Sequence, residues 1–225
     1  MASYLGADGN KLADDAAIDE IVYSVYDILI QPGIMYQPHP AFARDEQGTL
    51  RYQSLTEADL SGIHVLGDFR HTGTRELTAA DYVYQIKRLA HPQLHSPIFG
   101  LMSEYIVGLE DYAGTLQTAA EASSGEQGAY IDLTQYPLAG AEVVDRYHYR
   151  IKVHGKYPQL LYWLAMPFFA PVPPEVERLY SQPGMKQRNI TLDWYPVGTG
   201  PYMLPINNPN RQMVMERNPN FHGES

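Results

Sequence analysis

The chain has 225 residues, of which 44% are apolar and 19% charged, a composition typical of a soluble globular protein with one large or two small domains. Its formal charge of -10 argues against sequence-independent binding to nucleic acid or anionic lipid, since both require a basic face. The absence of cysteine excludes disulfide bonds and thiolate metal sites.

No apolar run approaches the roughly 20 residues that a membrane helix needs. The first ten residues, MASYLGADGN, lack the basic start, apolar segment and cleavage site of a secretory signal. Two interpretations remain open: the protein is cytoplasmic, or it is exported and its signal has been removed.

The first predicted element is a helix. Apolar residues between Asp14 and Ile30 recur at helical spacing, and Pro32 and Gly33 would end the helix. The following residues, 34–64, carry prolines and a polar stretch, and we expect a loop there with one short strand at most.

The segment ELTAADYVYQIKRLAHP gives the clearest helix signal. Thr78 and Asp81 have the spacing of a capping box, Lys87 and Arg88 suit the negative end of the helix dipole, and Pro92 would end the helix. Two further helices are predicted, one from Ser96-Pro97 toward Val107 and one from Leu109 to Ala122.

The periodicity then changes to that of a strand with one buried face, formed by Tyr147, Tyr149, Ile151 and Val153. Short helices are predicted in YPQLLYWLAM and PPEVERLYS, each started by proline. YMLPI and QMVMERN flank the turn cluster NNPNR and predict a hairpin. Because helices and strands mix without regular alternation, we expect an α/β fold of the mixed α+β kind.

Few residues suggest chemistry. His91 and His95 are four residues apart, but Pro92 lies between them and no third ligand has suitable spacing, so we predict no metal site and expect both histidines at the surface. His64 and His71 fit structural roles better than catalytic ones. No G-x-S-x-G elbow occurs, so we expect no enzyme activity and no cofactor.

The stretch DWYPVGTGPYML places two glycines around Thr199, as a phosphate-binding loop might. A Walker loop would need a lysine and a hydroxyl after its second glycine, where this chain has Pro201 and Tyr202. We therefore predict a structural turn in which Gly198 or Gly200 has a positive φ.

Several of these pieces together form a family pattern. FRHTGTRELTAADYVYQIKRLAHP, VVDRYHYRIKV, the PPEVERLY segment and VGTGPYML with VMERNPNFHGE occur in the order seen in family 5 extracellular solute-binding proteins. The resemblance covers roughly residues 66–223. Members of that family are the oligopeptide-, dipeptide- and nickel-binding components of ABC importers.

The resemblance implies a periplasmic-binding-protein-like type II fold, present in part. Residues 12–35 and 155–225 would belong to the first ligand-binding lobe, and residues 36–154 to an accessory domain inserted in it. The partners implied are a peptide or other small solute and an ABC permease in the membrane. The location implied is periplasmic or extracellular.

Most ligand contacts would then lie outside this sequence. Tyr84, which matches the tyrosine of the family's D-x-V-Y helix, is the one residue expected to face the cleft; otherwise it belongs to the core. Two alternatives stay open: a ligand-sensing module of a regulator with the same fold, and an unrelated hydrolase that uses His71.

Overall fold

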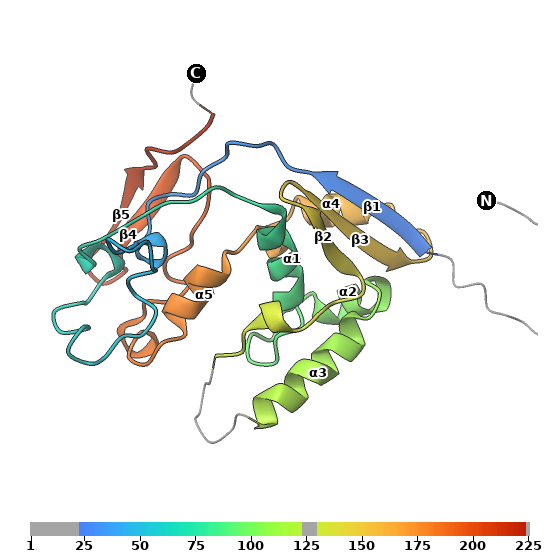
Figure 1. The fold of residues 1–225 in the computed structure, drawn as a ribbon, viewed down its shortest axis with the longest axis horizontal. Helices are drawn as coiled ribbons and strands as arrows, with labels where there is room; N and C mark the ends of the chain where they lie inside the picture. The colour runs from blue at the N-terminus through green and yellow to red at the C-terminus, as the bar shows by residue number, and fades with distance from the viewer. Residues whose placement is uncertain (1–22, 123–129, 224–225) are drawn as a thin grey trace, which may run out of the picture.

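The computed structural model describes residues 23–122 and 130–223, which form helices and two small antiparallel sheets (Figure 1). The regular elements in chain order are β1 (Tyr23–Leu29), α1 (Ala79–Arg88), α2 (Phe99–Tyr105), α3 (Leu109–Ala122), β2 (Ala141–Asp145), β3 (His148–His154), α4 (Leu160–Leu164), α5 (Pro174–Tyr180), β4 (Tyr202–Asn208) and β5 (Gln212–Arg217). The mixed α+β class predicted from the sequence is confirmed.

The larger sheet has the strand order β1-β3-β2 and lies at the opposite end of the molecule from the β4-β5 hairpin (Figure 1). Tyr149, Ile151 and Val153 of β3 point to one face and are buried, which confirms the predicted alternation there. Tyr147 does not share that face, because it lies in the turn between β2 and β3.

The helix predicted for Asp14–Ile30 is wrong over the part that the structure describes; residues 14–22 lie outside the described ranges. Residues 23–29 form β1, which pairs along its whole length with β3. The segment is rich in tyrosine, valine and isoleucine, which fit a pleated surface, and seven residue pairs with β3 outweigh the helical spacing. The Tyr26 hydroxyl also donates to the Tyr157 carbonyl at 2.9 Å.

The predictions for the helices are confirmed more closely. The capping box of α1 is present, with the backbone N–H of Thr78 donating to Asp81 at 2.9 Å, and α3 has the predicted ends. The helix α1 ends at Arg88, before Pro92. The predicted hairpin is also present, and Pro205 sits at its irregularity, where a missing N–H breaks no ladder bond.

Residues 34–64 contain no regular strand, as expected; single turns and isolated bridges order them.

Two hydrophobic cores organise the described residues. The first lies between the inner face of the β1-β3-β2 sheet and helices α1, α2 and α3. The second joins residues 36–77 to residues 176–197. This division differs from the predicted domain boundaries, because residues 36–77 were assigned to the accessory domain and residues 176–197 to the lobe. The assignment of lobe and accessory domain stays a prediction.

Arg75 ties the start of α1 to the start of α5. Its guanidinium donates to both carboxylate oxygens of Asp81, at 2.6 and 2.9 Å, and to both of Glu175, at 2.8 and 2.9 Å. The group also lies 5.4 Å from the ring centres of Tyr36 and Phe42. Such two-pronged pairing fixes geometry as well as charge.

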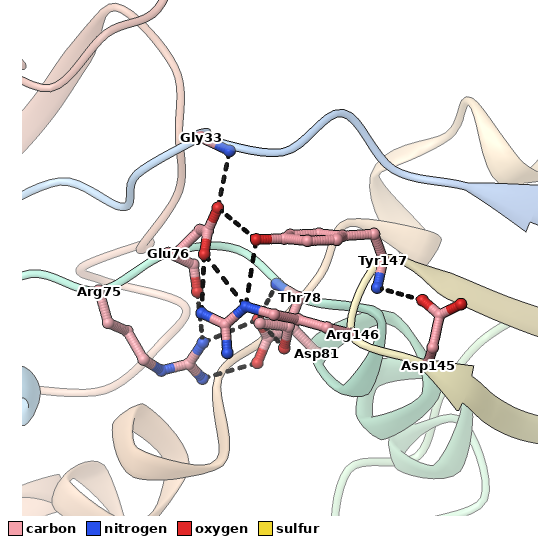
Figure 2. A network of polar contacts seen from close by, with 8 residues as sticks. All are labelled: Gly33, Arg75, Glu76, Thr78, Asp81, Asp145, Arg146 and Tyr147. Carbon is pink, nitrogen blue, oxygen red and sulfur yellow. Dashed lines mark hydrogen bonds and ion pairs between the residues drawn. The ribbon is translucent and has the colours of Figure 1, made fainter.

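The next residue, Glu76, connects the β2-β3 turn to the segment after β1 (Figure 2). Its carboxylate accepts hydrogen bonds from Arg146 at 2.7 Å, the Gly33 backbone at 2.7 Å and the Tyr147 hydroxyl at 2.9 Å. These bonds, with that from Arg146 the largest cause, lower the pKa of Glu76 to about 2.

Gly73 permits the close approach of two chain segments. His39 and Gly73 exchange two backbone hydrogen bonds, of 2.8 and 3.1 Å, and a Cβ at Gly73 would overlap the backbone of Phe42. We therefore expect Gly73→Ala to destabilise the fold by about 1–3 kcal/mol in urea unfolding.

Gly200→Ala is the matched control, because a Cβ there meets no atom within 4 Å and its φ is not positive. We expect Gly200→Ala to be neutral or slightly stabilising. Equal losses in the two variants would contradict the role given to Gly73.

Candidate functional site

Two buried amide side chains hold the VGTGPY segment. Gln37 donates its backbone N–H to the Gly198 carbonyl at 3.0 Å, and its side-chain oxygen accepts from the Gly198 N–H at 3.2 Å. Asn218 donates its backbone N–H to the Pro201 carbonyl and its side-chain N–H to the Gly200 carbonyl, both at 2.8 Å. Both side chains are buried, so the segment is fixed from two sides.

The predicted positive φ at Gly198 or Gly200 is wrong. Neither glycine is among the positive-φ residues, although the chain does bend at residues 199–201. The physical reason is the hydrogen bonding just described: Gln37 and Asn218 satisfy the backbone of the bend, so no left-handed residue is needed to turn it.

A buried histidine supports the segment that carries Gln37. The backbone N–H of Ala41 donates to Nδ1 of His39 at 3.1 Å, so the ring hydrogen lies on Nε2, 2.8 Å from the Tyr180 hydroxyl. That hydroxyl in turn donates to the Tyr195 carbonyl at 2.9 Å. Complete burial lowers the pKa of His39 to about 3, so the ring is neutral.

A cavity of about 350 Å³ adjoins this framework, between β4, the turn at residues 66–68 and the Gln37–Pro40 segment. Its apolar wall includes Leu66, Phe69, Met203 and Ile206. This size and lining suit a small ligand or one residue of a longer ligand.

The charged groups of the cavity are acidic. Asp68 and Glu216 line it, and none of its lining residues is basic. Asp68 uses one oxygen to accept the backbone N–H groups of His64 and Val65, at 2.7 and 3.0 Å. The other oxygen and the exposed Glu216 carboxylate could accept from a cation. The cavity thus suits an apolar group that carries an amine or guanidinium.

Tyr84 lies in the first core, with 2% of its surface exposed. This position fits the core alternative given for it and places it away from the cavity beside β4. Its hydroxyl makes no hydrogen bond to a described residue. Burial, followed by the nearby Glu177 and Tyr130, raises its pKa.

The remaining predictions about histidine concern exposure at the surface and the absence of a metal site. His64 and His71 are exposed, whereas His91, expected at the surface, is 8% exposed. Within residues 23–122 and 130–223, no group of three or more histidine or acidic side chains could hold a metal ion. No helix in that part of the chain is long and apolar enough to cross a membrane.

Sequence reasoning missed the cavity beside β4. Its lining residues lie far apart in the chain. Phe69 and Thr72 belong to the FRHTGTREL piece, and residues 203–206 and Glu216 belong to the predicted hairpin, but no pattern within these pieces indicates that they meet at one cavity. The amides that hold VGTGPY were also missed. Asn218 belongs to the RNPN piece of the family pattern, which could have drawn attention to it, but Gln37 carries no such signal.

One family profile matches more than half of the chain. Residues 71–225 match the profile described as "Bacterial extracellular solute-binding proteins, family 5 Middle". Similar solved structures include Listeria monocytogenes OppA bound to peptide, with 17% identity, a TM-score of 0.49, and coverage of 97% of this chain and 32% of that one. No curated protein matches the chain at a significant level.

Two further structures have comparable scores. Burkholderia pseudomallei OppA is 22% identical, with a TM-score of 0.44, and the match covers 66% of this chain and 25% of that one. The Helicobacter pylori DppA in complex with peptide STSA is 15% identical, with a TM-score of 0.45 and coverage of 93% and 30%. The chain therefore spans about a quarter to a third of the length of these structures.

Proposed function

This chain belongs to family 5 of the bacterial extracellular solute-binding proteins, and on that premise we propose that it is part of the receptor of an ABC importer that captures peptide-like solutes. The observation that carries the proposal is the family match over residues 71–225, more than half of the chain. The family is one of binding proteins, so the work proposed is differential binding of the solute, with no covalent change in it.

Three of the motif residues build the framework of the fold. Arg75 and Asp81 come from the TRELTAAD piece and Glu175 from the PPE piece, and together they form the ion-pair cluster between α1 and α5. This supports a structural role for the shared motifs. Solute contacts would then come from the cavity beside β4 and from parts of the receptor beyond these 225 residues.

The proposed location follows from the family, whose members are extracellular. We place the receptor in the periplasm or at the outer face of the membrane, where it would deliver its solute to a membrane permease. The charged lining residues of the cavity beside β4 are Asp68 and Glu216, which favour a solute with a basic or amino group.

Ligand-dependent stabilisation tests the proposal. For the full-length receptor with a short peptide at ten times its Kd, we expect a gain of about 1.4 kcal/mol, or roughly 1 °C in melting temperature for a chain of the length of its structural relatives. The 225-residue chain alone should gain little, because most contacts lie elsewhere.

Two results would contradict this proposal. A full-length protein that no short peptide stabilises would argue against a peptide receptor. Micromolar peptide binding by the 225-residue chain alone would show that the main contacts lie within it.

A further inference from the structure

A second cavity, of about 220 Å³, lies where the turn of the β4-β5 hairpin meets the segment after α5. It is bounded by residues 64–65, 188–189, 194–195 and 207–210. It shares only Val65 with the cavity beside β4, and the receptor proposal makes no use of it. The turn cluster NNPNR, which the sequence analysis treated only as a turn, supplies part of its lining.

Side-chain amides dominate the polar lining of this turn cavity. Four asparagines contribute to it, namely Asn189, Asn207, Asn208 and Asn210. An amide offers both hydrogen-bond donors and an acceptor, whereas a carboxylate accepts only and a guanidinium donates only. A hydroxyl group likewise both donates and accepts. A wall of amides therefore matches a ligand that carries several hydroxyl groups.

The hairpin turn is ordered by bonds that use only part of its amides. Nδ2 of Asn207 donates to the Trp194 carbonyl at 2.7 Å, which leaves its Oδ1 as an acceptor. Oδ1 of Asn208 accepts the backbone N–H of Asn210 at 3.1 Å, which leaves its Nδ2 as a donor. The carbonyl of Asn208 also accepts the Arg211 N–H at 3.0 Å and closes the turn. A donor and an acceptor thus stay available to a ligand from an already ordered turn.

The charge of the turn cavity favours a neutral ligand. No acidic residue is among the described residues that line it, and Arg188 is the one lining residue there with a permanent charge. Nη2 of Arg188 lies 3.3 Å from the carboxylate of Glu57, which is outside the lining, and its Nη1 donates to the Gly184 carbonyl at 2.9 Å. The arginine charge is therefore already balanced by a partner within the fold.

Trp194 supplies aromatic surface at the same place. It lines the cavity, is half-buried and packs against the second core, and its indole N–H bonds to no described residue. Such a ring offers a rigid apolar face with one polar edge. The C–H groups on one face of a pyranose ring form an apolar patch that can pack on an aromatic ring. The small volume suits one such sugar ring.

We propose that the turn cavity binds one pyranose unit of a neutral saccharide. The sugar hydroxyls bond to the free amide groups of Asn207, Asn208 and Asn210, and the apolar face of the ring packs on Trp194. This site is separate from the cavity proposed for the peptide-like solute. A sugar and a peptide therefore bind without competing, and the failure of either proposal leaves the other standing.

The probes are D-glucose, D-galactose and D-mannose, each titrated by calorimetry into the 225-residue chain. We expect a Kd below about 5 mM for at least one of them. D-glucuronate, which adds a carboxylate to the ring of D-glucose, should bind no more tightly than D-glucose. The absence of binding by all three sugars up to about 50 mM overturns the proposal. D-glucuronate binding at least about tenfold more tightly than any of the three overturns the assignment to a neutral ligand.

Tryptophan fluorescence tests where the sugar binds. The chain has two tryptophans, and Trp163 belongs to the first core, so Trp163→Phe leaves Trp194 as the only indole. In this variant the sugar should change the emission with the Kd found by calorimetry. Sugar binding with unchanged emission would place the site elsewhere.

Asn210→Ala tests the role of the turn amides. The Asn210 side chain makes no hydrogen bond to a described residue, and alanine keeps the backbone N–H that bonds to Asn208. The melting temperature should therefore stay unchanged while sugar binding weakens about threefold or more. Gln212→Ala is the matched control, because it removes an exposed amide of the same hairpin that does not line the cavity. Unchanged affinity in Asn210→Ala, or an equal loss in Gln212→Ala, would refute the assignment.

Discussion

Arg75→Met is expected to lower the free energy of unfolding by about 3–5 kcal/mol. The substitution leaves two carboxylates without their cation, and the Asp81 side chain is only 1% exposed, so its charge cannot be solvated without opening the start of α1. The loss would be a large share of the roughly 5–15 kcal/mol that stabilises a typical domain. Urea unfolding, followed by circular dichroism, measures it.

Arg70→Met is the control for this experiment. Arg70 is exposed and precedes the same motif, so its replacement should change stability by less than about 0.5 kcal/mol. A loss below about 1 kcal/mol in Arg75→Met would show that the Arg75 cluster does not hold α1 and α5 together.

Arg75→Lys distinguishes charge from geometry at the same position. Lysine keeps the positive charge but cannot donate to two carboxylates in parallel pairs. We therefore expect an intermediate loss. Wild-type stability in this variant would mean that the charge alone is sufficient and that the two-pronged hydrogen bonds add nothing.

The sequence allowed prediction of elements whose signals are local. The capping box at Thr78 and Asp81, the alternation in β3 and the turn cluster before β5 each lie within a few residues, and all three are present in the structure. The prediction failed at β1, where helical and extended patterns were both compatible with the residues. The choice there depends on pairing with β3, more than 100 residues away in the chain.

The candidate sites depend on still longer separations. Arg75 and Glu175 are 100 residues apart, and Gln37 and Gly198 are 161 apart. A motif marks such residues as a set, but it does not say which of them touch. The bend at VGTGPY shows the consequence, because local reasoning assigned it to glycine conformations whereas distant amides hold it in place.

Lowering the pH from 7 to 5 is expected to cost about 2 kcal/mol of stability through His39 alone. Its pKa is about 3 in the folded chain, against an ordinary value of 6.5. Below pH 6.5 the unfolded chain therefore binds a proton that the folded chain does not. Stability is complete above pH 6.5 and falls by about 1.4 kcal/mol for each pH unit down toward pH 3.

The geometry explains why the His39 ring does not bind this proton in the folded state. Protonation would place a hydrogen on Nδ1, which already faces the N–H of Ala41, and would put a charge in a fully buried site. Glu76 also loses stabilising interactions in acid, but only below about pH 4.5, where its unfolded form begins to bind protons. The change in stability between pH 7 and pH 5 therefore reports on histidine side chains and not on Glu76.

His39→Gln tests the assignment by urea unfolding at pH 7 and pH 5. The variant should be less stable at pH 7, because its bonds to Ala41 and Tyr180 are disturbed, but it should lose about 2 kcal/mol less than the wild type between the two pH values. His64→Gln, at an exposed histidine, should keep the wild-type pH dependence. His91 is also buried, and burial lowers its pKa, so a residual pH dependence of stability in His39→Gln is expected.

Equal losses in the wild type and His39→Gln would mean that His39 is protonated in the folded chain. The Gln37–Ala43 segment, and with it the wall of the cavity beside β4, would then not depend on a neutral ring.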